Sequence, residues 1–464
     1  MPTDPSPNAA DPLVDARGDV VLAVLKGYRT AEEAGRTLGV GTAEIHSWID
    51  AFIAGGRQSV DGNGSDMAAI EFVLALAQAL HRYGASAYRL EAGIKDVAHT
   101  LGLEVRLFST PTAIMASFGP LHAEKTCLVR VEPGEINLGK LAMLYDVTSQ
   151  FVQGTVTVPD ALAVVTAIIA ADPRYRFVIH MVCSGLASAA AAGFFGGGWL
   201  EIQVALGIGM VVGAVSRLSN RSTDTGHLLE PVAATLAALL SVAASRWFGP
   251  VETFVTTLAG VITLLPGMGF TTAMTELATN NLASGTARFA GAFVQLSGLG
   301  VGIALGMAIA SRWAPAVVAD GLVVWPLGML ALAVIVSSLA YSVILRARPR
   351  DTGWILAAGV LAYSGALVGQ SLIGPELGAL LGAFVVAFAS NLRGRLLDQA
   401  TAVTLVPGIL MLVPGSLGMR SVMAMWQNDV DSGVSAAFRM AFVATALVAG
   451  ILLANVAMPS RRPL

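Results

Sequence analysis

Polar and apolar residues alternate in the first third of this 464-residue chain, whereas long apolar stretches fill the rest. Residues 1–16 are acidic and proline-rich and are expected to form a disordered tail. Asp-Gly-Asn-Gly-Ser at 61–65 predicts a linker. The pattern therefore divides the N-terminal third into a module at 17–60 and a domain at 66–172.

Residues 66–172 begin with an amphipathic helical pattern, continue with two β-like runs at 104–115 and 125–131, and then return to helical periodicity. This order predicts an α+β domain. The residues contain no nucleophile–base pair and no histidine spacing typical of a metal site. We therefore expect neither catalysis nor a bound metal or cofactor.

Residues 17–60 resemble a transposase-type helix-turn-helix, with three predicted helices and a glycine turn before Thr42. In such modules the third helix enters the major groove and depends on basic side chains. Here the segment Thr42–Asp50 contains Glu44 and Asp50 but neither arginine nor lysine. Nucleic acid is thus not an expected partner, and a small helical docking or regulatory module is favoured.

From about residue 176 onward, apolar segments long enough to cross a bilayer follow one another, since a spanning helix needs about 20 such residues. Ten are predicted, in two repeats at 173–320 and 321–464. Their approximate bounds are 176–195, 199–216, 227–246, 250–266, 283–311, 322–345, 353–371, 374–392, 396–414 and 431–457.

The arginines between these segments are distributed unevenly, which predicts the orientation of the chain. Eleven fall on one side if the N-terminus is cytoplasmic: Arg174, Arg176, Arg217, Arg221, Arg346, Arg348, Arg350, Arg393, Arg395, Arg461 and Arg462. Arg246, Arg312 and Arg420 fall on the other side. Both termini and the soluble domain are therefore expected in the cytoplasm.

A three-part motif occurs twice with the same offset of 148 residues. Leu265-Pro266-Gly267 is followed by Asn280-Asn281 and Ser284-Gly285, and Val413-Pro414-Gly415 is followed by Asn428-Asp429 and Ser432-Gly433. A repeat of five helices inverts the second half relative to the first. The sequence thus predicts two inverted five-helix repeats, as in many secondary transporters.

Polar residues near each motif share a helix face, which marks a candidate solute site. Ionisable groups within membrane helices usually face a bundle interior or cavity, and Pro-Gly breaks free backbone polar groups. The candidates are Pro266, Gly267, Asn281, Ser284, Gly285, Arg288, Pro414, Gly415, Asp429, Ser432, Gly433 and Arg439. Asp429 or Asp431 could carry a coupled proton or hold a substrate ammonium. Helix capping, helix packing and snorkelling arginines are the alternative interpretation.

The composition fits this interpretation: 55% of the residues are hydrophobic and only 13% are charged, against about 25% charged residues in soluble proteins. The net charge of −3 argues against a general nucleic-acid binder. Cys127 and Cys183 lie in segments of different character, so no disulfide framework is expected.

Several motifs resemble the threonine/serine exporter family over roughly residues 66–460. They are Gly84-Ala-Ser-Ala-Tyr88-Arg89-Leu-Glu91, Phe108-Ser-Thr110-Pro111-Thr112, Phe194-Phe195-Gly196-Gly197-Gly198, Leu265-Pro266-Gly267, Ser284-Gly285-Thr-Ala-Arg288 and Val413-Pro414-Gly415-Ser416. The resemblance implies a cytoplasmic domain, ten membrane helices and proton-motive-force-driven export of small hydroxy amino acids. Glu201 stands where the family pattern suggests aspartate, and residues 17–60 lie outside that pattern.

We therefore expect a non-enzymatic secondary exporter or antiporter of threonine, serine or similar solutes in the cytoplasmic membrane. Its partners would be the amino acid, protons and the bilayer, and assembly with further copies stays open. Export of small carboxylates such as dicarboxylic acids is an alternative, because arginine pairs well with carboxylate. A membrane-anchored transcription regulator or hydrolase is the alternative of another class.

Overall fold

The structure is a computed structural model that describes residues 12–120, 124–132, 134–219, 228–312, 323–412 and 415–460. The side chains of 12–16, 54–66 and 375 are outside the description, as is most of the predicted tail at 1–16. The chain divides into one unit that ends at Glu71 and a second that begins at Phe72. Each unit is described by itself.

The first unit contains α1 (Pro12–Leu25), α2 (Ala31–Leu38) and the start of α3 (Thr42–Arg82). Thr30 and Glu33 form a reciprocal capping box at the start of α2, which satisfies free backbone amides there. Gly39 ends α2 with a φ of +70°, a conformation that favours glycine. Residues 61–65 belong to α3, so the predicted linker is wrong. Each glycine inside a helix costs about 1 kcal/mol, and the helical residues before and after this segment outweigh that cost.

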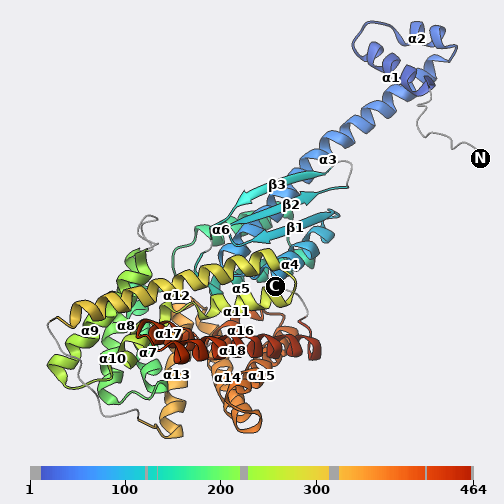
Figure 1. Cartoon of the computed structure of the whole chain (residues 1–464). Helices are drawn as coiled ribbons and strands as arrows, with labels where there is room; N and C mark the ends of the chain where they lie inside the picture. The colour runs from blue at the N-terminus through green and yellow to red at the C-terminus, as the bar shows by residue number, and fades with distance from the viewer. Residues whose placement is uncertain are drawn as a thin grey trace, which may run out of the picture. The chain divides into compact units, whose positions relative to one another are not determined.

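The soluble part of the second unit combines the end of α3 with α4 (Ala87–Thr100), three strands, α5 (Leu138–Val152) and α6 (Val158–Ala170). The strands are β1 (Val105–Thr110), β2 (Ala113–Phe118) and β3 (Lys125–Arg130), and they form an antiparallel sheet in the order β1-β2-β3. The run predicted as one strand at 104–115 is therefore a hairpin, because the chain turns between Thr110 and Ala113. Figure 1 shows the sheet at one end of the helical bundle.

The apolar part of the second unit consists of helices whose bounds lie close to the predicted spans. Within the described residues nine segments are long and apolar enough to cross a membrane, and counting a bent pair gives up to ten. They are α7 (Phe177–Phe194), α8 (Trp199–Ser219), α9 (Leu229–Phe248), α10 (Thr253–Gly260) with η2 (Ile262–Leu264) and α11 (Gly267–Ala278), α12 (Leu282–Ala310), α13 (Leu327–Ile344), η3 (Pro349–Asp351) with α14 (Thr352–Ile373), α15 (Pro375–Leu397), α16 (Ala402–Leu410) with α17 (Gly415–Trp426), and α18 (Val430–Ala457).

Helix pairings in the two halves correspond. In the first half α12 packs along α9 and against α11; in the second half α18 packs along α15 and against α17. The turns before α12 and α18 also match, because Asn280 and Asn428 both adopt a left-handed conformation, with φ of 62° and 64°. Between the halves, α11 contacts α18 while α17 contacts α12. The repeated motif of the sequence therefore marks a repeated local structure.

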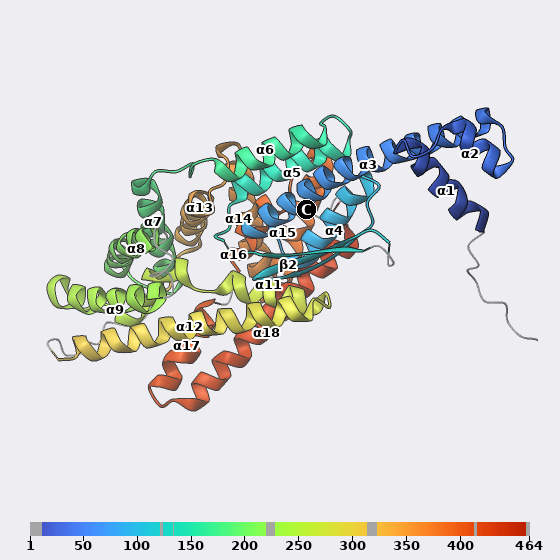
Figure 2. The same cartoon turned by 90° about the horizontal axis from the view of Figure 1, so that it is seen from above.

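Helix α5 attaches the soluble domain to the second half of the bundle, where it lies beside α16 (Figure 2). The backbone amides of Leu138 and Gly139 donate to the carbonyls of Leu345 and Arg346 at 2.9 and 3.1 Å. These bonds satisfy groups that a helix N-terminus and a helix C-terminus leave unpaired. The soluble domain is thereby fixed to the end of α13.

Candidate functional site

The first Pro-Gly motif breaks a membrane helix in the middle of the bundle. Helix α10 ends at Gly260, and the segment Ile262–Ala278 that follows is bent by 48° against it. Within that segment Pro266, which has no amide hydrogen, separates η2 from α11. The Gln295 side chain of α12 donates from Nε2 to the carbonyl of Leu264 at 3.1 Å. A polar side chain thus satisfies a backbone group that the break releases.

The second motif meets the first. Residues 413–414 lie outside the described part of the chain, so the predicted role of Pro414 has no structural account. Gly415 is buried, and a methyl group on its Cα would lie 3.2 Å from Cβ of Leu265 and 3.6 Å from Cα of Gly267. The segment around Leu265 and Gly267 and the start of α17 therefore approach each other closely at Gly415.

Two cavities lie on either side of this meeting point. The domain-side cavity, about 560 Å³, reaches from His180 at the start of α7 to Pro266 at the first break. The far-side cavity, about 310 Å³, is lined by Phe194 at the other end of α7 and by Ser416 beyond the second break. Each cavity therefore reaches one break, from opposite ends of the bundle.

Three side chains line both cavities: Ile262 of η2, Tyr341 of α13 and Leu410 of α16. We call them the dividing layer. Ile262 belongs to the broken helix of the first half and Leu410 to that of the second half. Tyr341 belongs to α13, the first helix of the second half. The layer is largely apolar, with one phenol group, and separates two spaces that are lined partly by polar groups.

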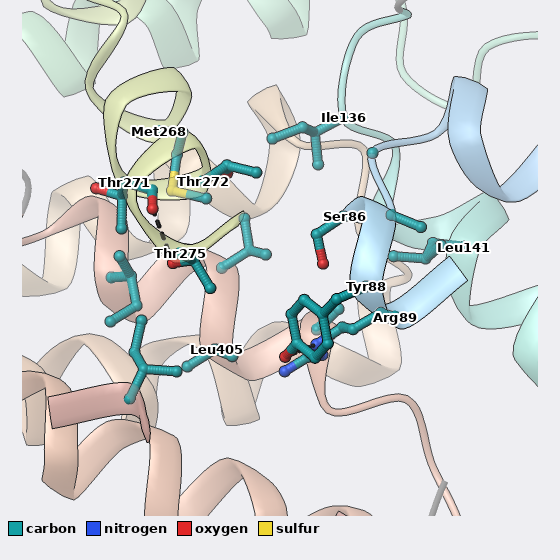
Figure 3. Close-up of a pocket in the computed structure, with 16 residues that line it drawn as sticks. Ser86, Tyr88, Arg89, Ile136, Leu141, Met268, Thr271, Thr272, Thr275 and Leu405 are labelled. Atoms are coloured by element: carbon teal, nitrogen blue, oxygen red, sulfur yellow. Dashed lines mark hydrogen bonds between the residues drawn. The ribbon is translucent and has the colours of Figure 1, made fainter. Parts of the chain in front are cut away.

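A third and smaller cavity, the vestibule, lies between the soluble domain and the broken helices and has a volume of about 100 Å³. Figure 3 shows Ser86, Tyr88 and Arg89 of the α4 segment across from Thr271, Thr272 and Thr275 of α11. Ile136 and Met268 line both the vestibule and the domain-side cavity. The three cavities thus follow one another from the soluble domain to the far side.

The predicted polar face of the first half packs inside its own repeat. Ser284 is buried, and its hydroxyl has no hydrogen-bond partner among the described residues. Gly285 packs on Leu277, and Asn281 bonds through its side chain to Thr279. Arg288 pairs with Glu276, with Nε and Oε2 3.1 Å apart.

The predicted polar face of the second half lies at the start of α18. Asp429 is exposed and accepts the backbone amide of Ser432, which caps the helix. Hydrogen bonds from Ser432 hold the pKa of Asp429 below its usual value. Gly433 packs on Met425, Asp431 and Ser432 are exposed, and Arg439 lies 3.9 Å from Glu376.

The structure brings together the breaks rather than these two faces. Of the predicted residues that it describes, only Pro266 lines any of the three cavities, while Gly267 and Gly415 meet beside them. Solute binding by the remaining predicted residues, and proton transfer by Asp429 or Asp431, stay predictions.

A buried charged cluster at the base of the soluble domain was missed by the sequence reasoning. The side chain of Glu276 has no exposed surface. Its Oε1 accepts the backbone amide of Ala87 at 2.9 Å, and its Oε2 faces Arg288 in an ion pair without hydrogen-bond alignment. The available signal was an acidic residue inside an apolar helix directly after a Pro-Gly break, which marks a functional or packing constraint.

Two further titratable groups lie near this cluster. Burial raises the pKa of Glu91, which accepts the amide of Ser109 at 2.9 Å, and the charge of Glu276 raises it further. Burial lowers the pKa of His81, whose Nε2 lies 2.9 Å from the carbonyl of Thr110. Over the described residues, no group of three His, Cys, Asp or Glu side chains has a geometry that could hold a metal ion.

Comparison with known proteins identifies two matching family models. The threonine/serine exporter model matches residues 71–310, and a second model, "Threonine/Serine exporter, ThrE", matches residues 330–457. Together they cover the soluble domain and both halves of the bundle. Residues 17–60 lie outside both matches.

Among curated proteins, similar relatives are fungal. Pheromone-regulated membrane protein 10 of Eremothecium gossypii is 26% identical over 419 residues, which cover 83% of this chain and 54% of the relative. The Candida albicans protein of the same name is 26% identical over 385 residues, covering 78% of this chain and 34% of the relative. The chain thus spans about half or less of the length of these relatives. No solved structure matches.

Proposed function

Because the chain belongs to the threonine/serine exporter family, a family of membrane transporters, we propose that it exports threonine, serine or similar small polar amino acids. We further propose that export crosses the cytoplasmic membrane, that both termini are cytoplasmic, and that the proton motive force drives it as an antiport. The observation that carries this proposal is the pair of cavities separated by one dividing layer at the meeting of the two Pro-Gly breaks.

The proposed mechanism is alternating access between two inverted repeats. A solute enters the domain-side cavity and reaches the dividing layer beside the first break. A movement of one half against the other then separates Ile262, Tyr341 and Leu410 and opens the far-side cavity. The close contact at Gly267 and Gly415 provides the pivot, since small residues let backbones slide at short distance.

The proton-coupled step requires a group that can change its charge. Asp429 and Asp431 remain our candidates for it, and replacement of each by asparagine tests them. Efflux that keeps its dependence on the proton gradient in both variants would remove the two residues from the mechanism. Export of small carboxylates is tested in the same assay with a labelled dicarboxylic acid as the competing substrate.

Substitutions that change the size of a side chain in the dividing layer test the proposed route. Leu410→Trp adds an indole where both cavities meet, so efflux of preloaded labelled threonine should stop while the protein still reaches the membrane. Leu372→Trp is the matched control, because Leu372 is 72% exposed near the end of α14. Leu410→Ala should have the opposite effect and allow leak of threonine without a proton gradient. Normal efflux by the Leu410→Trp protein would refute the proposed route.

A further inference from the structure

The vestibule contains a positive charge that no acidic group of the described protein neutralises. Arg89 is half-buried at the start of α4, and among the described residues no carboxylate oxygen lies within 4.0 Å of its guanidinium. Its hydrogen-bond partners are neutral: Nε donates to the Tyr88 hydroxyl at 2.9 Å, and Nη1 donates to Oγ1 of Thr401 at 3.1 Å. The arginines near the domain interface behave differently, because Arg288, Arg346 and Arg348 each pair with a carboxylate.

These contacts orient the guanidinium at the cavity wall. Tyr88 and Thr401 hold Nε and Nη1 from two different parts of the fold, and Tyr88 also lies under the guanidinium with its ring centre 5.8 Å away. A planar guanidinium held in this way is suited to bind a carboxylate through two parallel hydrogen bonds. Beside it, the Ser86 hydroxyl makes no capping bond to α4.

The opposite wall offers acceptors. Thr271 donates its hydroxyl to the carbonyl of Gly267, and Thr275 donates to the carbonyl of Thr271, so each keeps oxygen lone pairs that can accept a hydrogen bond. Both residues line the vestibule, as does Thr272 (Figure 3). Hydroxyl oxygens in this position suit an ammonium or hydroxyl group. The remaining wall is apolar, with Leu405 and Met268 among its residues.

We propose that the vestibule is the first binding site for the transported solute, and that it recognises a small zwitterionic amino acid by its carboxylate through Arg89. This inference rests on the proposed function and names the group that selects the substrate. The ammonium and short polar side chain of the solute face the threonines of α11. A cavity of about 100 Å³ holds several water-sized volumes, which is enough for a small solute. Release past Ile136 and Met268 delivers the solute to the domain-side cavity.

The test is equilibrium binding of labelled threonine to the purified full-length protein, with unlabelled threonine and threoninol as competitors. Threoninol lacks the carboxylate, so it should compete poorly against the wild type. Arg89→Gln keeps an amide donor at the chain position of Nε, which contacts Tyr88, but removes the charge, and it should weaken threonine binding at least about tenfold and abolish the preference over threoninol. Arg106→Gln is the control, because Arg106 is exposed and pairs with Glu124 elsewhere in the same domain.

Tyr88→Phe provides a second variant that keeps the ring and removes one anchor of Arg89, and it should weaken binding less than Arg89→Gln does. A folded Arg89→Gln protein that binds threonine as the wild type does, or a wild type that binds threoninol equally well, would overturn the assignment. The outcome is separable from export itself. Arg89-dependent binding without any efflux would refute export and leave the site standing, whereas efflux with an unchanged KM in Arg89→Gln would refute the site alone.

Discussion

Replacement of Glu276 tests whether the soluble domain is locked to the first broken helix by a buried charge. Glu276→Gln keeps an acceptor for the amide of Ala87 but leaves Arg288 without its counter-charge. Breaking one side of a buried pair costs about 3–5 kcal/mol. The side chain of Arg288 is 22% exposed and recovers part of its hydration, so we expect a loss of about 2–3 kcal/mol.

The size of the effect should follow the contacts that each variant removes. Glu276→Ala also leaves the buried amide of Ala87 without an acceptor, which adds about 1–3 kcal/mol. The control, Glu124→Gln, removes a surface pair with Arg106 whose side chains are 57% and 28% exposed, and it should cost less than about 1 kcal/mol.

The measurement is denaturant or thermal unfolding of the purified protein in detergent, with limited proteolysis to report release of the soluble domain. We expect the order of stability to be wild type, Glu124→Gln, Glu276→Gln and Glu276→Ala. The double variant Glu276→Gln with Arg288→Met should recover most of the loss of Glu276→Gln, because it removes both charges and keeps an acceptor for the amide of Ala87. If Glu276→Ala is as stable as the Glu124→Gln control, the buried pair does not hold the domain.

Four further predictions concern other parts of the molecule. The pKa of His81 is lowered from 6.5 in the folded protein, so the unfolded chain binds more protons below that pH. Acidification from neutral pH should therefore lower the unfolding midpoint of the wild type, and it should have a smaller effect on His81→Gln. Glu91 has the opposite pH dependence: because its pKa is raised in the folded protein, the wild type should become less stable as the pH rises above 4.5. The unfolding midpoint of Glu91→Gln should not show this decrease. In α12, Gly302→Ala should destabilise the bundle, because an added Cβ would lie 2.3 Å from the Pro231 carbonyl oxygen. Gly291→Ala is the control, because a Cβ there meets nothing within 4 Å, and equal unfolding midpoints would contradict this packing. Cysteines introduced at Ser416 and Thr279 should react differently with an impermeant reagent in intact cells, the first labelled and the second protected, and equal labelling would refute the inverted repeats.

The helices and the two breaks could be predicted because their signals are local. Apolar runs of membrane-spanning length set most helix bounds to within a few residues. The two spans predicted to end at 266 and 414 continue in the structure to Ala278 and Trp426. Asn280 and Asn428, which are related by the offset of 148 residues, share a left-handed backbone conformation. The sequence did not predict that α3 continues through residues 61–65, because the glycines there favour a loop. The helix continues because the residues before and after this segment are helical.

The site was predicted only in part because its contacts join distant segments. Glu276 lies 189 residues from Ala87, and Arg89 lies 312 residues from Thr401, so helix periodicity gives no sign of either contact. In the structure Arg288 of the predicted polar face pairs with Glu276 of the same half, a contact that helix periodicity does not indicate. Sequence spacing defines which residues share a helix face, and only the packing of helices defines what that face meets.

Export in a reconstituted system tests the central claim most directly. Proteoliposomes that contain the purified protein are preloaded with labelled threonine or serine, a proton gradient is imposed, and release is followed with and without an uncoupler. The account predicts that labelled amino acid leaves against its concentration gradient, that the uncoupler stops this movement, and that Leu410→Trp protein shows none of it. Verified insertion of the protein without movement of either amino acid, or movement unaffected by both the uncoupler and Leu410→Trp, would contradict it.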